Sequence, residues 1–138
     1  MSPTDTQTLD AIAADYWTAL MGRYPTWATS VSIHVHDSRL EDLRPEALTA
    51  WQLQLEAFRT RLSLVNAAGL SERQRVTLEM LRHEVEMGLV MSRLGAETWS
   101  LDQLGGPQVG LLDLVRVHVV KDAASARSEE HTSELQSP

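Results

Sequence analysis

Apolar residues recur every three or four positions over most of the chain up to Gly95, which is the spacing of amphipathic helices. A first helix is predicted from about Thr8 to Arg23. Its apolar face consists of Leu9, Ile12, Tyr16 and Leu20, widened by Trp17 and Met21. We expect Pro25 to end this helix, because the residue before a proline is pushed out of the helical conformation.

A second helix is predicted to begin at Pro45, since proline is favoured in the first turn of a helix. It is predicted to end near Gly69, because glycine is common just after a helix. Its apolar residues step by three and four throughout: Leu48, Trp51, Leu55, Phe58, Leu62 and Val65. This spacing indicates a seam that packs against another helix.

A third helix is predicted from Ser71 to Gly95. Ser71 and Gln74 have the spacing of a capping box, in which each side chain bonds to the other residue's backbone N–H. One apolar stripe consists of Leu78, Leu81, Val85 and Leu89. A second consists of Met80, Met87, Met91 and Leu94. Two stripes predict a helix that is buried over a wide face.

The remaining segments are shorter. Residues 26–45 contain the alternation Val31, Ile33, Val35, but no second convincing strand exists to pair with it, so we predict a loop or a single helical turn. A Gly-Gly-Pro break precedes a short apolar helix predicted from about Gln108 to Val120. The fold is therefore predicted to be all-α, an open bundle of about four to five helices. Its apolar faces exceed what these helices cover, which predicts the incomplete N-terminal part of a larger helical protein.

Composition narrows the functional classes. The 138 residues are 43% hydrophobic, include no cysteine and carry a formal net charge of -7. An acidic chain without a basic stripe repels phosphate backbones, which argues against nucleic-acid binding. The sequence has neither an 18-residue apolar run nor a secretory signal, so we expect no membrane partner and a cytoplasmic location.

Three stretches are candidates for chemistry. His34 and His36, beside Asp37, share a face and can ligate a metal if their segment is extended. The pair His83-Glu84 begins like the zinc signature H-E-x-x-H, but Met87 stands where the second histidine belongs, so we interpret His83 as an exposed helix residue. "LGGPQVG" is glycine-rich but fits no phosphate-binding motif, which favours a tight turn.

Several short motifs, in this order, carry a family resemblance: "DYW", "P-x-x-AT", "HDSRLEDL", "LEMLRHEVE" and "LDQLGGPQ". The resemblance covers about Leu9 to Val120, and "RL-x-DL" and "QLGGPQ" are its most specific parts. The chain resembles the N-terminal region of the bacterial family "domain of unknown function 885". It departs from the family at Ser32, commonly glycine, at His36, commonly tyrosine, and at Arg44, commonly serine or threonine.

The resemblance implies a function for a longer parent protein. Members are long, mostly helical proteins similar to zinc-dependent peptidases of the gluzincin type, with a signature of the form H-E-x-x-P-G-H-H far downstream. That signature does not occur in this chain, so the resemblance implies zinc and a peptide substrate only for the parent. It assigns no catalytic or metal residue here. It implies a cleft-lining or structural role for Asp37, Arg39, Gln103, Gly105, Gly106, Pro107 and Gln108. The alternative is a salt bridge between Asp37 and Arg39 and a tight turn at 103–108.

The ending "RSEEHTSELQSP" continues none of the preceding patterns. Residues 127–137 are compatible, without a gap, with one translated frame of a common sequencing adapter. We therefore divide the chain into a helical fragment, residues 1–126, and an artefactual tail, residues 127–138. The tail lacks the apolar residues that offset ordering entropy, so we expect it to be disordered.

Two functions remain open. The first is a non-catalytic N-terminal fragment of a zinc-dependent, peptidase-like hydrolase, which contributes packing and part of a cleft wall. Its partner is the missing C-terminal remainder of its own chain. The alternative is a small stand-alone helical interaction module, with Met80, Met87, Met91 and Trp51 as its apolar surface.

Overall fold

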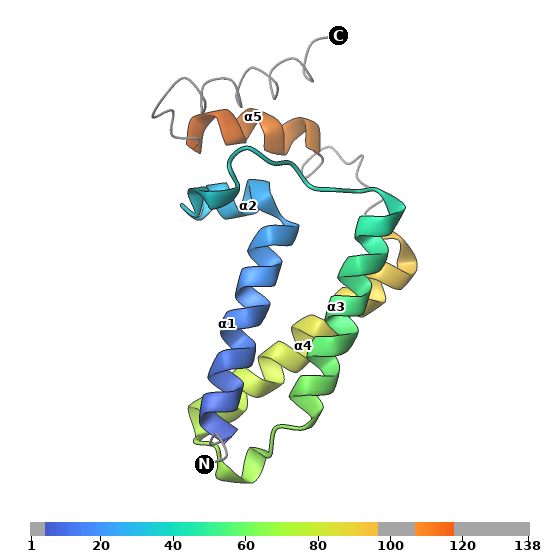
Figure 1. The fold of residues 1–138 in the computed structure, drawn as a ribbon. Helices are drawn as coiled ribbons and strands as arrows, with labels where there is room; N and C mark the ends of the chain where they lie inside the picture. The colour runs from blue at the N-terminus through green and yellow to red at the C-terminus, as the bar shows by residue number, and fades with distance from the viewer. Residues whose placement is uncertain (1–4, 97–106, 118–138) are drawn as a thin grey trace. The chain divides into compact units, whose positions relative to one another are not determined.

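The structure, a computed structural model, describes residues 5–96 and 107–117 (Figure 1). Within these ranges all regular secondary structure is helical, which confirms the predicted all-α fold. The chain forms two compact units. One combines residues 1–20 with 43–97, and the other combines residues 21–42 with 98–138. We describe each unit separately. Among the described residues, none of the helices has the length and apolar character needed to cross a membrane.

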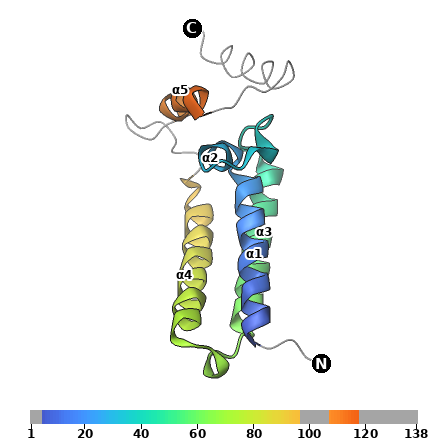
Figure 2. The ribbon, with the colours of Figure 1, turned by 90° about the vertical axis from the view of Figure 1, so that its left-hand side faces the viewer.

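The first unit consists of three long helices. They are α1 (Asp5–Arg23) up to Leu20, α3 (Pro45–Ser63) and α4 (Glu72–Leu94). The helices alternate in direction, and α4 lies on one side of the pair formed by α1 and α3 (Figure 2). The short 3₁₀ turn η2 (Ala67–Gly69) joins α3 to α4.

The core of this unit lies between the predicted apolar faces of the three helices. Its members from α1 and α3 are Leu9, Ile12, Tyr16, Trp51, Leu55, Phe58 and Leu62. Tyr16 and Phe58 meet edge to face with ring centroids 5.4 Å apart. Such a pair adds to the free energy gained by burying the two rings. Trp17, which was expected to widen the face of α1, instead lies 45% exposed.

The end of α3 differs from the prediction. The helix ends at Ser63 rather than near Gly69, and Gly69 belongs to η2. Arg82 of α4 donates from Nη2 to the carbonyl oxygen of Leu62 at 3.1 Å, which gives this carbonyl a second donor beside the N–H of Val65 at 3.4 Å. The side chain of Asn66 then accepts from the backbone N–H of Ala68 at 3.0 Å and begins the 3₁₀ turn.

Helix α4 begins and ends as predicted. Ser71 and Gln74 form the capping box, with the Ser71 N–H donating to Gln74 Oε1 at 3.0 Å. Gly95 ends the helix in the left-handed conformation at φ 63°. The first apolar stripe is buried, with Leu78, Val85 and Leu89 at 1% exposure or less. The expected wide burial is wrong, however, because the second stripe faces away from α1 and α3 and is exposed.

The second unit contains the end of α1, the short helix α2 (Pro25–Ser30), the 3₁₀ turn η1 (His34–His36) and α5 (Pro107–Val117). Helix α2 packs against α5 (Figure 1). The predicted loop or single helical turn is confirmed by α2 and η1, and the predicted apolar helix after the Gly-Gly-Pro break by α5. Residues 118–120, the Gly105–Gly106 turn and the tail 127–138 lie outside the described residues.

Candidate functional site

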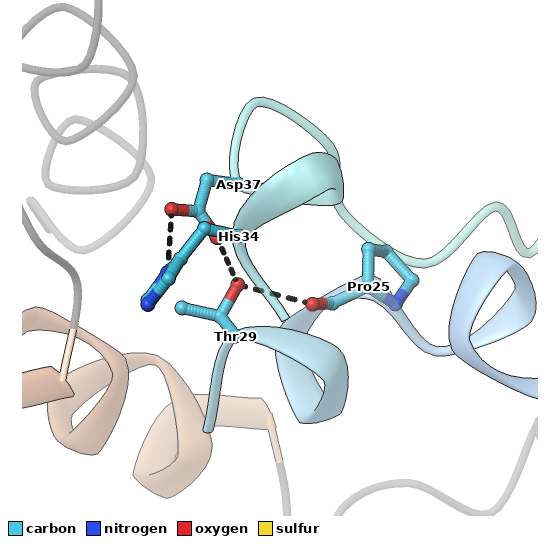
Figure 3. Close-up of polar contacts among 4 residues, drawn as sticks. All are labelled: Pro25, Thr29, His34 and Asp37. Atoms are coloured by element: carbon cyan, nitrogen blue, oxygen red, sulfur yellow. Dashed lines mark hydrogen bonds and ion pairs between the residues drawn. The ribbon is translucent and has the colours of Figure 1, made fainter. Parts of the chain in front are cut away.

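The residues with the densest polar contacts in the second unit surround the turn that follows α2 (Figure 3). Asp37 lies at their centre. Its Oδ1 is 2.7 Å from the hydroxyl of Thr29, and its Oδ2 is 3.0 Å from Nδ1 of His34. The Thr29 hydroxyl also lies 3.2 Å from the carbonyl oxygen of Pro25, so its single proton serves two acceptors. Thr29 itself is buried, with 2% of its surface exposed.

The contact with Asp37 determines which nitrogen of the His34 ring faces the carboxylate. A carboxylate only accepts hydrogen bonds, so Nδ1 of His34 must carry the proton in this pair. The second ring nitrogen, Nε2, then points away from Asp37 (Figure 3). The side chain of His34 is 30% exposed and that of Asp37 is 16% exposed. The arrangement therefore holds the imidazole in one orientation, with Nδ1 toward Asp37, in a side chain that is partly exposed.

The backbone that places His34 is a helix C-terminus of the Schellman type. The N–H of Ile33 bonds to the carbonyl of Ala28 at 2.8 Å, and the N–H of Ser32 bonds to that of Thr29 at 3.0 Å. This motif requires a left-handed residue at Ser32, whose φ is 66°. Glycine is the residue that adopts this conformation without strain, so serine at this position has a conformational cost.

Glu41 connects the segment after the turn to the start of α2 by hydrogen bonds. Its Oε1 accepts from the Thr26 backbone N–H at 3.1 Å and from the Thr26 hydroxyl at 2.6 Å. Thr26 is the second residue of α2, and the preceding Tyr24 provides no side-chain cap. Glu41 therefore caps the helix from a distance of fifteen residues along the chain.

Arg23, which is only 9% exposed, makes a second contact between this segment and the region where α2 begins. Its Nη1 donates to the carbonyl oxygen of Asp42 at 2.9 Å, and its guanidinium lies 5.3 Å from the centroid of the Tyr24 ring. Nε and Nη2 of Arg23 are buried and have no hydrogen-bond partner among the residues that the structure describes. Together, Arg23 and Glu41 hold the segment that contains Asp42 against the beginning of α2.

The structure describes four of the seven site residues predicted from the sequence, and they lie in different places. Asp37 is part of the network. Arg39 is exposed, and the contacts of Asp37 described above are with His34 and Thr29. Pro107 and Gln108 form the first turn of α5. Gln103, Gly105 and Gly106 lie outside the described residues.

The metal hypothesis for His34 and His36 assumed an extended segment. The residues instead form a 3₁₀ turn, in which positions three apart lie together, and this brings His34 to Asp37 rather than to His36. Across the part of the chain that the structure describes, no group of three or more His, Cys, Asp or Glu side chains could hold a metal ion. His83 is exposed on α4, as predicted.

Sequence reasoning missed the partners of this network. Thr29 was noted only as a motif residue, and Arg23, Thr26 and Glu41 were given no role. A usable signal was present in Pro25, which is favoured at the first position of a helix and so indicates that α2 begins there. A helix start needs acceptors for its first N–H groups, and Glu41 is the nearby acidic residue that supplies one.

The comparisons with known proteins give one match. A family model with the description "Bacterial protein of unknown function (DUF885)" matches residues 25–131. The matched range includes α2, the turn with His34 and Asp37, and helices α3 to α5. It also includes residues 127–131, the first part of the tail segment. Neither the curated proteins nor the solved structures contain a match to the chain.

Proposed function

Because the chain belongs to the bacterial DUF885 family, we propose that it is the non-catalytic N-terminal part of a zinc-dependent, peptidase-like hydrolase. In this proposal the helices of the first unit provide packing, and the turn at His34–Asp37 forms part of the wall of a substrate cleft. The hydrolase assignment rests on the resemblance of the motifs in this chain to those of the family.

The observation that carries the cleft role is the fixed orientation of His34. A histidine on a surface loop is ordinarily free to rotate, and ordering it costs conformational entropy. Here the carboxylate of Asp37, itself held by the buried hydroxyl of Thr29, holds the ring in place. An imidazole positioned in this way can accept a hydrogen bond from a peptide N–H through Nε2.

The described residues do not fit a zinc site, because they contain no group of three or more potential ligands. The signature H-E-x-x-P-G-H-H is likewise absent from the sequence. We therefore assign zinc and the scissile peptide bond to the remainder of the parent protein, and we expect the chain alone to have no hydrolytic activity. When bound, zinc polarises a peptide carbonyl and activates water.

A second candidate function is a stand-alone helical interaction module. It is favoured by the exposed methionines of α4, since Met80, Met87 and Met91 are 63%, 42% and 48% exposed. Trp51, however, is 6% exposed and belongs to the core, so it cannot be part of this surface. The module would consist of α4 alone.

The test uses peptide hydrolysis by the longer gene product, with zinc removed and restored by a chelator and ZnCl₂. Activity that requires zinc is expected. In that protein His34→Ala should raise KM about threefold to tenfold, as expected for one lost hydrogen bond, with a smaller effect on kcat. His36→Ala, on the same turn, is the matched control and should leave KM unchanged. Zinc-dependent hydrolysis by the 138-residue chain alone, or equal effects of the two variants, would contradict the proposal.

A further inference from the structure

The outer face of α4 has the pattern of a helix-packing seam, but none of the helices that the structure describes packs on it. Val76, Met80, His83, Met87, Val90 and Leu94 follow one another in steps of four and three, the a/d spacing of a coiled coil. Val76, Met80 and Leu94 are 55%, 63% and 56% exposed. The helix is at the edge of the three-helix unit, with α1 and α3 on its other side (Figure 2).

The first half of this seam lies in a shallow groove of about 650 Å³, lined entirely by residues of α4. Its lining includes the seam residues Val76, Met80 and His83, together with the charged residues Glu72, Glu79, Glu84 and Arg75. Methionine side chains are flexible and polarisable, so they adapt to the side chains of a second helix. The groove therefore suits an elongated apolar ligand that lies along the helix axis.

One edge of the seam carries a regular row of negative charge. Glu72, Glu79 and Glu86 are seven residues apart, so they occupy the same flanking position in three successive heptads. Two arginines lie near the row. Arg82 bonds to Glu79 at 2.8 Å, and Arg59 lies 4.0 Å from Glu86. Exposed ion pairs of this kind contribute little to the free energy of unfolding. The two glutamates can therefore leave these arginines and form ion pairs with basic residues of a partner helix.

We propose that this face of α4 binds an amphipathic helix whose apolar seam is flanked by lysine or arginine at seven-residue spacing. This rests on the packing role proposed for the helices of the first unit, and it specifies the apolar and basic residues of the partner helix. Opposite charges at the flanking positions select the partner and orient it, while the apolar seam provides most of the affinity.

The charge pattern disfavours a second copy of the chain as the occupant. Two antiparallel copies of α4 set the rows of Glu72, Glu79 and Glu86 against each other, and two parallel copies set Glu79 against Glu84. Like charges at these positions destabilise the pair. The residues that follow α4, 97–138, contain seven Asp or Glu and three Lys or Arg, so they lack a basic row as well. The partner helix therefore comes from outside this chain.

The experiment uses two designed peptides of about three heptads with leucine at every a and d position. One has lysine at every e and g position, and the other has glutamate there, so neither peptide pairs with itself. Binding to the full 138-residue chain is measured by fluorescence anisotropy of the labelled peptide. We expect the lysine peptide to bind at least about tenfold more tightly, with a preference that falls as salt screens the charges.

Three variants test the two parts of the face. The double variant Met80→Asn with Met87→Asn should weaken the lysine peptide about tenfold or more. The triple variant Glu72→Gln, Glu79→Gln and Glu86→Gln should remove most of the preference for lysine. Leu53→Asn is the matched control, because Leu53 is 65% exposed on α3 and lies outside the seam. It should leave the affinity unchanged.

Equal affinity for the two peptides would overturn the proposal, and so would binding that the methionine variant does not weaken. Sedimentation that shows a dimer which Met80→Asn dissociates would assign the face to a second copy instead. This assay needs neither zinc nor a peptide substrate nor the longer protein. Its failure would therefore leave the hydrolase proposal standing, and a longer protein without zinc-dependent activity would leave the peptide-binding result unaffected.

Discussion

Ser32 shows how a single backbone angle connects the sequence to the candidate site. The Schellman motif at the end of α2 needs a left-handed residue, and this chain has serine there at φ 66°. This conformation costs free energy in a residue with a Cβ atom, because the Cβ crowds the following carbonyl. The strain is tolerated because the bonds from Ile33 and from Asp37 hold the turn that positions His34.

Ser32→Gly is expected to stabilise the chain. The glycine relieves the left-handed strain but gives the unfolded chain more freedom, so a net gain of about 1 kcal/mol in the free energy of unfolding is expected. Urea denaturation followed by circular dichroism measures it. The matched control is Ser38→Gly, since Ser32 alone among the described non-glycine residues has a positive φ. A control gain as large as that of Ser32→Gly would refute the explanation.

At the scale of elements, local signals were sufficient to predict the buried face of α3 and both ends of α4. The a/d seam of α3 predicted the burial of Trp51, Leu55, Phe58 and Leu62, and the capping box at Ser71 and the glycine at 95 fixed both ends of α4. These features depend on neighbours within four or five residues. A single sequence therefore carries the information that determines them.

Two of the features that could not be predicted depend on residues distant in the sequence. The end of α3 at Ser63 is completed by Arg82, twenty residues away. The cap of α2 comes from Glu41, fifteen residues beyond Thr26. The pairing of Asp37 with His34 requires a 3₁₀ turn, whereas the alternation of Val31, Ile33 and Val35 resembles a strand. Tertiary contacts decided the first two cases, and a local 3₁₀ turn decided the third.

The close packing of α4 on α3 predicts that alanine has different effects on stability at Gly88 and at Gly22. A Cβ added at Gly88 would lie 3.1 Å from Cδ1 of Leu55, which is fully buried, whereas one added at Gly22 meets nothing within 4 Å. Gly22→Ala should therefore add about 0.5 to 1 kcal/mol to the free energy of unfolding, as expected from helix propensity. Gly88→Ala should gain at least about 0.5 kcal/mol less, because the contact offsets the propensity. Equal gains in thermal or urea unfolding would show that α4 packs less closely on α3.

At the scale of the whole molecule, two features point beyond this chain. The outer seam of α4 is apolar, exposed and flanked by a row of glutamates. The family match begins at Pro25 and continues past the last described helix to residue 131. Both features agree with a proposal in which the helices support a longer protein, and the fixed imidazole of His34 contributes to its cleft.

The measurement that tests this account most directly is a long read of the gene across the codon for Ala126, from DNA without ligated adapter ends. The account predicts a reading frame that continues for hundreds of codons with further helical patterns and reaches a segment of the form H-E-x-x-P-G-H-H. A stop codon directly after Pro138, with residues 127–138 encoded in the genome, would contradict it and would favour the interaction module.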